Sequence, residues 1–537
     1  MGPLGEWTPD GSLAKLLQWR VEEAPEHEFL YVEDDGPWSY GRIADEAVRL
    51  RDQLHVHGVS RGDLVVVRVG NDERFVAAAF GVWLLGGGVI AVHPSAPASD
   101  IVSVAASMRA EAVIADPRDS AAGAAGLPVV ASARFSTGRR RGSREAGAFT
   151  APADIAGTSI ALVLLTSGST GKPKGVALSH DGAWANLRST VSAFRTDTRP
   201  SGLPESPKPP NLIANPLSHT AGVVRLLFAL YVGRSVALLR KFDGVTAQRL
   251  IERHGIDNLT INPAMMRILL DALPPGERLG GVRYVSSGTA PLPAALREEF
   301  ESRFDVPVLQ AYGQTEAFGG IAIESVKDVL SGRRRPGSVG KPLPGVELRI
   351  VDSSGTDVAD GGSVGELWVR TKSTTSGYLG SSDSSPVDVD GWLRTGDQGR
   401  LDSDGYLYIT GRLKNIIICG GFNIVPEEIE AALIEEESVR EAVVLGIADT
   451  RLGEVPVAVV ESQVDSAALL ARVADRLAPY KRPRQLFCVE RLPRVPNGKV
   501  DRPAVAAMAR ELATPDGDQR RQLPGVSGTG QHVPAND

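Results

Sequence analysis

Cysteine is nearly absent from this chain of 537 residues, which contains only Cys419 and Cys488. Two cysteines cannot form the disulfide framework that holds many secreted domains together, and they fit a reducing compartment. The sequence also lacks the clusters of cysteine and histidine that bind transition metals. We therefore expect a cytoplasmic protein without a transition-metal site of that kind.

An excess of positive charge and a long apolar run are also missing. The chain has 58 lysines and arginines against 65 aspartates and glutamates, a net charge of −7, so no general affinity for nucleic acid is expected. Its most apolar long stretch, residues 223–239, contains Arg225 and Arg234 and is too short to span a membrane. Residues 1–12 lack the basic and apolar regions of a signal peptide. We expect no nucleic-acid partner and no integral membrane segment.

The remaining composition is that of an ordinary globular protein, with 42% hydrophobic and 23% charged residues. A chain of this length is too long for a single core, so two or more domains are expected. Between residues 38 and 116 helical and strand patterns alternate, which predicts a parallel α/β arrangement. The predicted helices are 40–55 and 74–86, and the predicted strands are 64–69, 88–92 and 112–115.

Residues 160–180 read IALVLLTSGSTGKPKGVALSH, two apolar runs around a polar loop at 166–175. Glycines let a backbone approach a ligand closely, and successive N–H groups can then form an anion-binding nest. Hydroxyl groups and lysines add further donors and positive charge. The residues concerned are Thr166, Ser167, Gly168, Ser169, Thr170, Gly171, Lys172, Lys174 and Gly175. This composition predicts a loop that binds polyphosphate.

The same loop does not fit a P-loop, which needs Gly-Lys-Ser/Thr at the start of a helix. Here Gly171 and Lys172 are followed by Pro173, which has no hydroxyl and disfavours helical geometry at Lys172. A P-loop is therefore excluded. For the loop taken alone, a flexible surface segment remains the alternative.

Six further motifs follow this region, in one order along the chain. They are NPLSHTAG at 215–222, SSGTAPL at 286–292, AYGQTE at 311–316, TGD at 395–397, GRLK at 411–414 and PNGKVDR at 496–502. Together with the loop at 166–175, the set resembles the adenylate-forming superfamily of acyl- and aryl-CoA synthetases, adenylation domains of peptide synthetases, and luciferases. The resemblance covers about residues 38–502 and is closest to acyl-CoA synthetases.

This resemblance implies an α/β fold in several parts. A large N-terminal domain of layered α/β subdomains plus a small β subdomain would occupy residues 1–413. A small, mobile C-terminal α+β domain would occupy residues 414–513, with Lys414 at the hinge, where relatives often carry aspartate. The polar residues 514–537 are expected to form a disordered tail.

The resemblance also assigns roles to single residues. Tyr312 would stack on adenine, Thr315 would contact the α-phosphate, and Glu316 would bind Mg²⁺, which favours carboxylate and phosphate oxygens. His219 would lie beside the acyl pocket, although a structural histidine is an open alternative. The other implied nucleotide-binding residues are the loop residues 166–172, Lys174, Gly288, Thr289, Ala290, Gly313, Asp397 and Arg412, the last two at the ribose.

The implied reaction has two halves. A carboxylate attacks the α-phosphate of ATP to give an acyl adenylate and pyrophosphate, and a thiol then attacks the adenylate and releases AMP. Lys499 would offset the repulsion between carboxylate and phosphate in the first half. No general base is needed there, because a carboxylate is already ionised. In the second half the small domain would rotate, Lys499 would leave, and Gly420 and Gly421 would line the thiol channel.

The acceptor and the acid are less defined. Coenzyme A is the expected thiol, while a carrier-protein phosphopantetheine or an amine acceptor is the alternative, and a luciferase-like oxygenase also remains open. A non-catalytic nucleotide-binding relative is disfavoured, because Lys499, Glu316 and Asp397 are all present. Residues 215–222 contain no acidic residue that could hold an α-ammonium group, and apolar residues follow them. We therefore expect an aliphatic or aryl acid without an α-amino group.

Overall fold

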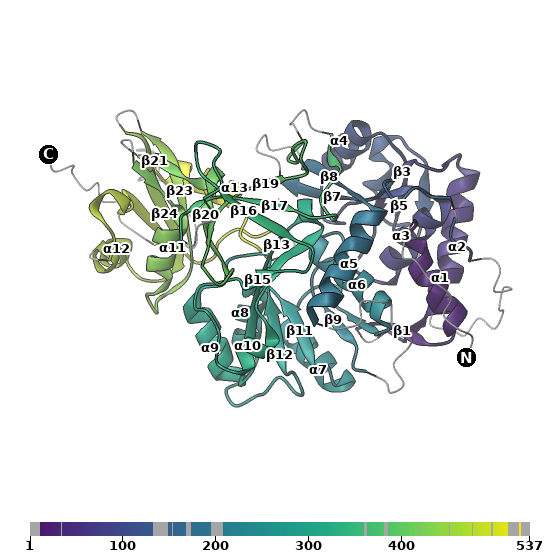
Figure 1. Ribbon diagram of the computed structural model, residues 1–537, viewed down its shortest axis with the longest axis horizontal. Coiled ribbons are helices and arrows are strands. Elements are labelled where there is room, and N and C mark those ends of the chain that lie inside the picture. The colour runs from purple at the N-terminus through teal and green to yellow at the C-terminus, as the bar shows by residue number, and fades with distance from the viewer. Residues whose placement is uncertain are drawn as a thin grey trace. The chain divides into compact units, whose positions relative to one another are not determined.

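Two compact units make up the protein, which Figure 1 shows as a ribbon. The first unit contains residues 1–289, 300–348 and 368–394, and the second contains residues 290–299, 349–367 and 395–537. The computed structural model describes residues 11–33, 35–132, 149–152, 154–167, 173–194, 208–358, 362–380, 385–419, 422–449, 452–474, 476–495, 498–513 and 526–527. Among the helices of these residues, none combines the length and the apolar character that a membrane span requires.

The largest sheet of the first unit has seven strands in the order β18-β8-β7-β4-β3-β5-β6. The five strands from β7 to β6 run parallel, whereas β8 is antiparallel to both of its neighbours, β7 and β18. The strands are β3 (Leu64–Arg68), β4 (Gly88–Ala91), β5 (Ala110–Ala115), β6 (Val129–Ala131), β7 (Ile160–Ser167), β8 (Pro173–Ser179) and β18 (Gly377–Leu379). The parallel part agrees with the helix–strand alternation of residues 38–116.

Three helical segments connect the parallel strands from β3 to β6. They are α3 (Glu73–Leu85), α4 (Ala98–Met108) and the 3₁₀ turn η1 (Ala122–Ala125), while α2 (Tyr40–Val56) precedes β3. Helix α3 is buried along nearly its whole length, as expected for a helix that is apolar on every face. It starts at Asp72, whose side chain accepts a hydrogen bond from the N–H of Arg74, and ends at Gly86 with φ of 80°. A left-handed residue at this point suits glycine, so Gly86 is a helix stop.

Two further sheets complete the first unit. Their strand orders are β2-β1-β10-β9 and β11-β12-β13-β14-β15. The strands are β1 (Glu28–Val32), β2 (Trp38–Ser39), β9 (Asn211–Ile213), β10 (Val236–Leu238), β11 (Asn258–Ile261), β12 (Tyr284–Ser287), β13 (Val308–Gln314), β14 (Gly319–Ile323) and β15 (Lys341–Pro342). The helices around them are α5 (His180–Phe194), α6 (Thr220–Val232), α7 (Gly244–His254), α8 (Pro263–Ala272), α9 (Ala294–Phe304) and α10 (Val326–Leu330), with the 3₁₀ turn η3 (Thr315–Ala317).

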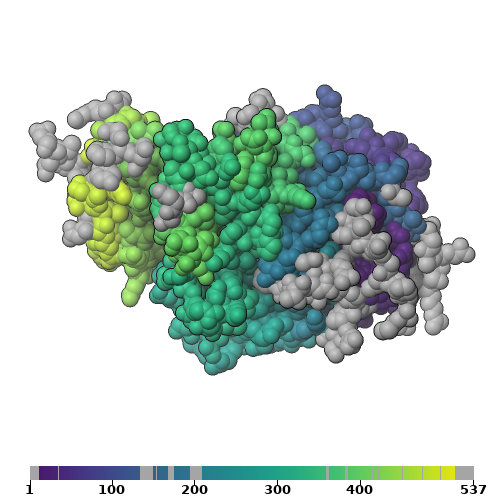
Figure 2. All heavy atoms as spheres, in the orientation of Figure 1, coloured from purple at the N-terminus to yellow at the C-terminus, as the bar shows by residue number. Residues whose placement is uncertain are grey.

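The N-terminal helix α1 (Ala14–Glu23) is fixed to α6 by a buried arginine. Arg20 donates from Nε to the carbonyl of Leu230 at 2.7 Å and from Nη2 to that of Tyr231 at 3.0 Å. These carbonyls lie in the last turn of α6, where a helix leaves its acceptors unsatisfied. Figure 2 shows purple atoms of the N-terminal segment beside blue atoms from the middle of this unit.

The second unit contains most of a sheet ordered β16-β17-β19-β20 and all of a six-stranded sheet. In the latter, β22-β21-β24-β25-β26 are neighbours and β23 also pairs with β24. The strands are β16 (Glu347–Val351), β17 (Gly365–Arg370), β19 (Leu393–Leu401), β20 (Leu407–Arg412), β21 (Ile417–Cys419), β22 (Phe422–Ile424), β23 (Val439–Asp449), β24 (Gly453–Ser462), β25 (Gln485–Val489) and β26 (Val526–Ser527).

Helices cover both faces of the six-stranded sheet. They are α11 (Pro426–Ile434), α12 (Ser466–Ala474) and α13 (Arg502–Ala513), with the 3₁₀ turns η4 (Leu413–Asn415) and η5 (Pro479–Lys481). Along β23, Val444 packs with α11 and α12, while the preceding Val443 packs with α13. Successive residues of a strand point to opposite faces, so this alternation explains the two cores.

The architecture confirms the predicted α/β fold of a large and a small part. The domain boundary at 413/414 stays a prediction. Of the tail at 514–537, only Val526 and Ser527 are described, and they form β26 beside β25.

Candidate active site

The predicted phosphate loop connects the two antiparallel strands β7 and β8. Thr166 on β7 lies opposite Lys174 on β8. The strands extend further than the sequence indicated, since β7 runs to Ser167 and β8 begins at Pro173. Five predicted loop residues lie outside the described residues, namely Gly168, Ser169, Thr170, Gly171 and Lys172. A strand follows the loop, which agrees with the exclusion of a P-loop.

The AYGQTE segment forms the exposed end of β13 and the turn after it. The first two residues of β13 are buried and its last five are half-exposed, including Tyr312 and Gly313. Thr315 and Glu316 continue this half-exposed run in η3. Packing also requires glycine at position 313, because a Cβ on Gly313 would fall 2.0 Å from the carbonyl oxygen of Gly319. The strand therefore presents a continuous accessible edge of polar residues.

Tyr378 links this edge to the phosphate-loop hairpin. Its hydroxyl donates a hydrogen bond to Oε1 of Glu316 at 3.1 Å, and Nζ of Lys174 lies 5.0 Å from the centre of its ring. Tyr378 takes this place because β18 pairs with β8, which puts it opposite Val176. A cation over an aromatic ring is attracted by the ring's negative face. Lys174 and Glu316, predicted from separate motifs, are thus brought together around one tyrosine.

A second contact joins the same edge to helix α6. The hydroxyls of Thr220 and Thr315 lie 2.8 Å apart, within hydrogen-bond distance. His219 precedes Thr220 and caps α6, with Nδ1 accepting a hydrogen bond from the N–H of Ala221 at 3.3 Å. The helix cap is a structural role, and the role of His219 beside the acyl pocket stays a prediction.

The predicted adenine turn follows β12 with an unusual backbone. Thr289 has φ of 70°, a left-handed conformation that is costly for a β-branched residue. Among the described residues its buried hydroxyl finds no hydrogen-bond partner. A Cβ on the neighbouring Gly288 would lie 3.3 Å from the carbonyl oxygen of Ala311, so this turn packs closely on AYGQTE. A strained turn with a free hydroxyl beside the accessible edge fits a ligand that supplies the missing contacts. Ala290, predicted with this turn, belongs to the second unit.

In the second unit, the two predicted ribose ligands form an ion pair. Asp397 on β19 lies opposite Arg412 on β20, and Nε of Arg412 is 2.5 Å from Oδ1 of Asp397. Asp397 is 3% exposed, whereas half of the Arg412 side chain is accessible. The carboxylate is therefore fixed in place, while the guanidinium can reach a further acceptor.

Lys499 lies near the same arginine. A tight turn presents it, in which the N–H groups of Val495 and Gly498 donate to the carbonyls of Lys499 and Val495, at 2.9 and 2.8 Å. Burial, together with the positive charge of Arg412, lowers the pKa of Lys499 to about 8. Asp397, Arg412 and Lys499 thus form one charged group within the second unit. Gly420 and Gly421 lie outside the described residues, and of Lys414 only the backbone is described, in η4.

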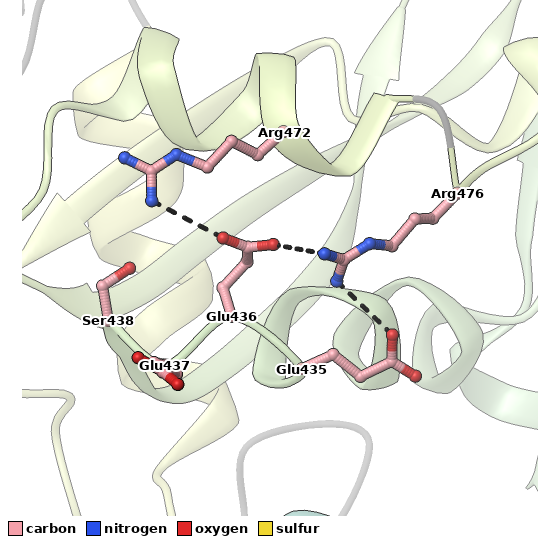
Figure 3. Close-up of a pocket in the computed structure, with 6 residues that line it drawn as sticks. All are labelled: Glu435, Glu436, Glu437, Ser438, Arg472 and Arg476. Atoms are coloured by element: carbon pink, nitrogen blue, oxygen red, sulfur yellow. Dashed lines mark hydrogen bonds and ion pairs between the residues drawn. The ribbon is translucent and has the colours of Figure 1, made fainter.

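A surface hollow of the second unit contains none of the predicted residues. It measures about 550 Å³ and is lined by Glu435, Glu436, Glu437, Ser438, Arg472 and Arg476. Figure 3 shows that its charges satisfy one another, with Arg476 bound to Glu436 at 2.6 Å and to Glu435 at 3.4 Å. It is a surface cluster of ion pairs.

Sequence reasoning missed Tyr378 and Thr220 as members of the site. Thr220 lies inside the NPLSHTAG motif at 215–222. The strand pairing that brings Tyr378 to Glu316 and the helix packing that brings Thr220 to Thr315 join residues far apart in the chain. Within the described residues, no group of three or more His, Cys, Asp or Glu side chains could hold a metal ion by itself. Mg²⁺ needs few protein ligands when phosphates supply the others, so Glu316 alone fits it.

Comparison with known proteins gives a consistent family. The model of the AMP-binding enzyme family matches residues 17–379, and that of the AMP-binding enzyme C-terminal domain matches residues 428–499. A sulfoacetate–CoA ligase of Cupriavidus necator is 32% identical, covering 91% of this chain and 96% of the relative. A 2-succinylbenzoate–CoA ligase of Bacillus pumilus is 31% identical, covering 91% of this chain and 97% of the relative.

Solved structures agree with these matches. ATP-bound MatB from Rhodopseudomonas palustris superposes with a TM-score of 0.80 at 27% identity, covering 93% of this chain and 100% of that one. The o-succinylbenzoate CoA synthetase of Bacillus subtilis, in complex with its acyl-adenylate intermediate, gives a TM-score of 0.77 at 26% identity, covering 93% and 98%. The chain belongs to the AMP-binding family of adenylate-forming enzymes, in its acyl-CoA synthetase group, as the resemblance of its motifs indicated.

Proposed function

We propose that this protein joins a carboxylic acid to coenzyme A at the expense of ATP. The acid carboxylate attacks the α-phosphate, the bond to pyrophosphate breaks, and an acyl adenylate forms. The thiol of coenzyme A then attacks the adenylate carbonyl, AMP leaves, and the thiol proton is released to solvent. The observation that carries this proposal is the contact between Lys174, Tyr378 and Glu316, which unites two predicted phosphate-binding motifs.

Each group of residues has a task in the first half-reaction. Lys174 and the donors of the β7–β8 hairpin would bind the triphosphate, and Tyr378 holds Glu316 in the orientation that a metal ligand needs. Mg²⁺ bound at Glu316 would supply positive charge to the phosphate oxygens. Thr315, oriented by Thr220, would donate to the α-phosphate. Lys499 would place a cation between two anions that otherwise repel each other.

The second half-reaction requires that Lys499 leave the reacting atoms. The family resemblance implies a rotation of the small domain about Lys414, which brings Gly420 and Gly421 to the thiol channel. Both steps are part of this proposal. Residues without side chains would let a pantetheine arm pass close to the backbone.

The acid is expected to lack an α-amino group. Residues 215–222 carry no carboxylate to pair with an ammonium, and α6 continues with apolar residues. An unpaired ammonium in such a place would lose its hydration without compensation. Similar ligases are named for acids as different as sulfoacetate, 2-succinylbenzoate and indoleacetate, so family membership leaves the acid open.

The test is a screen for ATP-dependent release of pyrophosphate over a panel of carboxylic acids. In matched pairs, the acid without an α-amino group should release pyrophosphate faster than its amino acid. AMP and the CoA thioester should form in equal amounts. Consistent preference for amino acids would overturn the acid class. If a phosphopantetheinylated carrier protein is acylated faster than coenzyme A is, the acceptor is the carrier protein.

A further inference from the structure

Helix α6 has one accessible stripe on an otherwise buried surface. Of its thirteen residues nine are buried, and the four that are half-exposed are Ala221, Val224, Arg225 and Phe228. Spacings of three, four and seven residues place these four on one side of a helix. The stripe is apolar except for Arg225, so this side of α6 presents hydrophobic side chains and one guanidinium.

This stripe starts at the candidate active site. Thr220, next to its first member, contacts Thr315. One turn further, Cγ2 of Val224 lies 3.5 Å from the place where a Cβ on Gly319 would stand, with Nδ2 of Asn186 at 3.7 Å and Cγ2 of Thr220 at 3.9 Å. Gly319 lies two residues after η3, so the stripe faces the end of AYGQTE.

Arg225 lies further along α6 than Thr220 and Val224. The rise from Thr220 to Arg225 along the helix is about 7.5 Å. Arg225 interacts electrostatically with Tyr284, the first residue of β12, whereas the predicted adenine turn follows the last residue of that strand. The guanidinium is therefore displaced from the adenine turn toward the far end of β12.

The charge of Arg225 is not balanced by an acid. Among the described residues it forms no hydrogen bond or ion pair, and the groups that act on it are the Tyr284 hydroxyl and a second cation, Arg234. Arg234 itself is paired with Asp257 at 2.8 Å. The surrounding protein lowers the pKa of Arg225 to about 10, which still leaves it charged at neutral pH. A cation among apolar side chains and without a counter-ion is costly unless a ligand supplies one.

We propose that Arg225 is a specificity-determining residue and that the acid carries a second anionic group, a carboxylate or a sulfonate, which binds Arg225. This inference rests on the acid–CoA ligase function proposed above. The carboxylate to be activated lies near Thr315, the apolar middle of the acid lies against Val224, and the distal anion pairs with the guanidinium. An acid of this kind still has no α-amino group.

The experiment compares each α,ω-dicarboxylic acid with its own monomethyl ester, which has the same length but one charge fewer. Sulfo-carboxylic acids extend the set to distal sulfonates. Pyrophosphate release is measured for the wild type, Arg225→Gln and Arg225→Lys. The wild type should favour the best doubly charged acid over its ester or uncharged analogue by about 30-fold or more in kcat/KM, mainly through KM. Arg225→Gln should remove that preference, as loss of one partner of a buried charge pair does. Arg225→Lys should keep part of it.

Controls separate the possible outcomes. Arg118→Gln removes the same charge from an arginine whose side chain is 81% exposed, and it should change nothing. Arg225→Gln should unfold at the same temperature as the wild type or higher, because it removes an unpaired cation. Equal use of diacids and esters by the wild type, or an unchanged preference in Arg225→Gln, would overturn the role of Arg225 while leaving the ligase function intact. Failure of the wild type to activate any acid would refute the proposed function, and this inference with it.

Discussion

At the scale of single residues, the proposed chemistry depends on the positions of positively charged side chains. Lys499 and Arg412 lie close enough in the second unit for the arginine to lower the pKa of the lysine. Two neighbouring cations repel each other unless an anion lies between or beside them. This arrangement fits the proposed binding of a negatively charged reactant by Lys499 and Arg412.

The first prediction follows from that arrangement. Lys499→Ala should reduce adenylate formation by roughly three orders of magnitude, about 4 kcal/mol of barrier, because it removes the cation proposed to lie between carboxylate and phosphate. Thioester formation from a supplied acyl adenylate should remain nearly at the wild-type rate. Rapid-quench assays of the two half-reactions measure the rates of adenylate formation and of thioester formation. An equal loss in the two halves would contradict a role confined to the first.

The second prediction concerns pH. Burial lowers the pKa of Lys499 from 10.5 to about 8, so the charged form that the reaction needs is lost as the pH rises through 8. The value of kcat/KM, which reports free enzyme, should fall above that pH. The fall in kcat should come at higher pH, because bound phosphate and carboxylate favour the cation. Lys499→Arg stays charged, so its residual activity should lack the alkaline limb. A limb that persists in Lys499→Arg would assign it to another group.

At the scale of elements, the sequence predicted strands and helices better than the contacts between them. The strand at 88–92, the helix at 40–55 and the glycine stop at Gly86 could be predicted because each depends on local pattern or backbone geometry. The positions of Tyr378 and Thr220 could not, since they depend on β18 pairing with β8 and α6 packing beside η3. The phosphate-loop strands also run longer than predicted, because ladder bonds such as those pairing Thr166 with Lys174 extend strands into polar residues.

Helix α5 supplies a prediction about stability. Its first residue, His180, is fully buried and accepts a hydrogen bond at Nδ1 from the N–H of Leu13 at 3.0 Å. Burial lowers the pKa of His180 to about 4. Between pH 6.5 and 4 the unfolded chain binds more protons at this residue than the folded one. The free energy of unfolding therefore decreases as the pH is lowered, by about 2 kcal/mol at pH 5. The free energy of unfolding, measured with denaturant, should depend more steeply on pH in the wild type than in His180→Asn, which keeps an acceptor but does not titrate. The same pH dependence in both proteins would show that His180 contributes nothing to it.

The turn η4 supplies a prediction about motion. If Lys414 is the hinge, its φ and ψ must change between the two half-reactions. Lys414→Pro fixes φ near −65° and should slow thioester formation strongly while adenylate formation survives. Lys414→Ala, which leaves the backbone free, serves as the control. Wild-type turnover of Lys414→Pro in the complete reaction would place the hinge elsewhere.

At the scale of the whole molecule, two compact units hold different parts of the chemistry. The first contains the phosphate-loop hairpin, AYGQTE and the half-exposed stripe of α6, and the second contains Asp397, Arg412 and Lys499. Order and identity of motifs were enough to predict the family, which the matches to 17–379 and 428–499 confirm. The acid could not be predicted from those motifs, because family members share them whatever acid they use. Its determinants lie in residues such as Arg225, whose meaning depends on burial and on the absence of a described counter-ion.

The central claim is that the acid is activated as an acyl adenylate. The most direct measurement uses the best acid of the panel with ¹⁸O in both carboxylate oxygens, followed by mass spectrometry of the products. Because the attacking oxygen stays bonded to the α-phosphorus when the thiol displaces AMP, one ¹⁸O should appear in AMP, one in the thioester carbonyl and none in pyrophosphate. AMP without label, or label in a phosphate released from the β or γ position, would contradict the account.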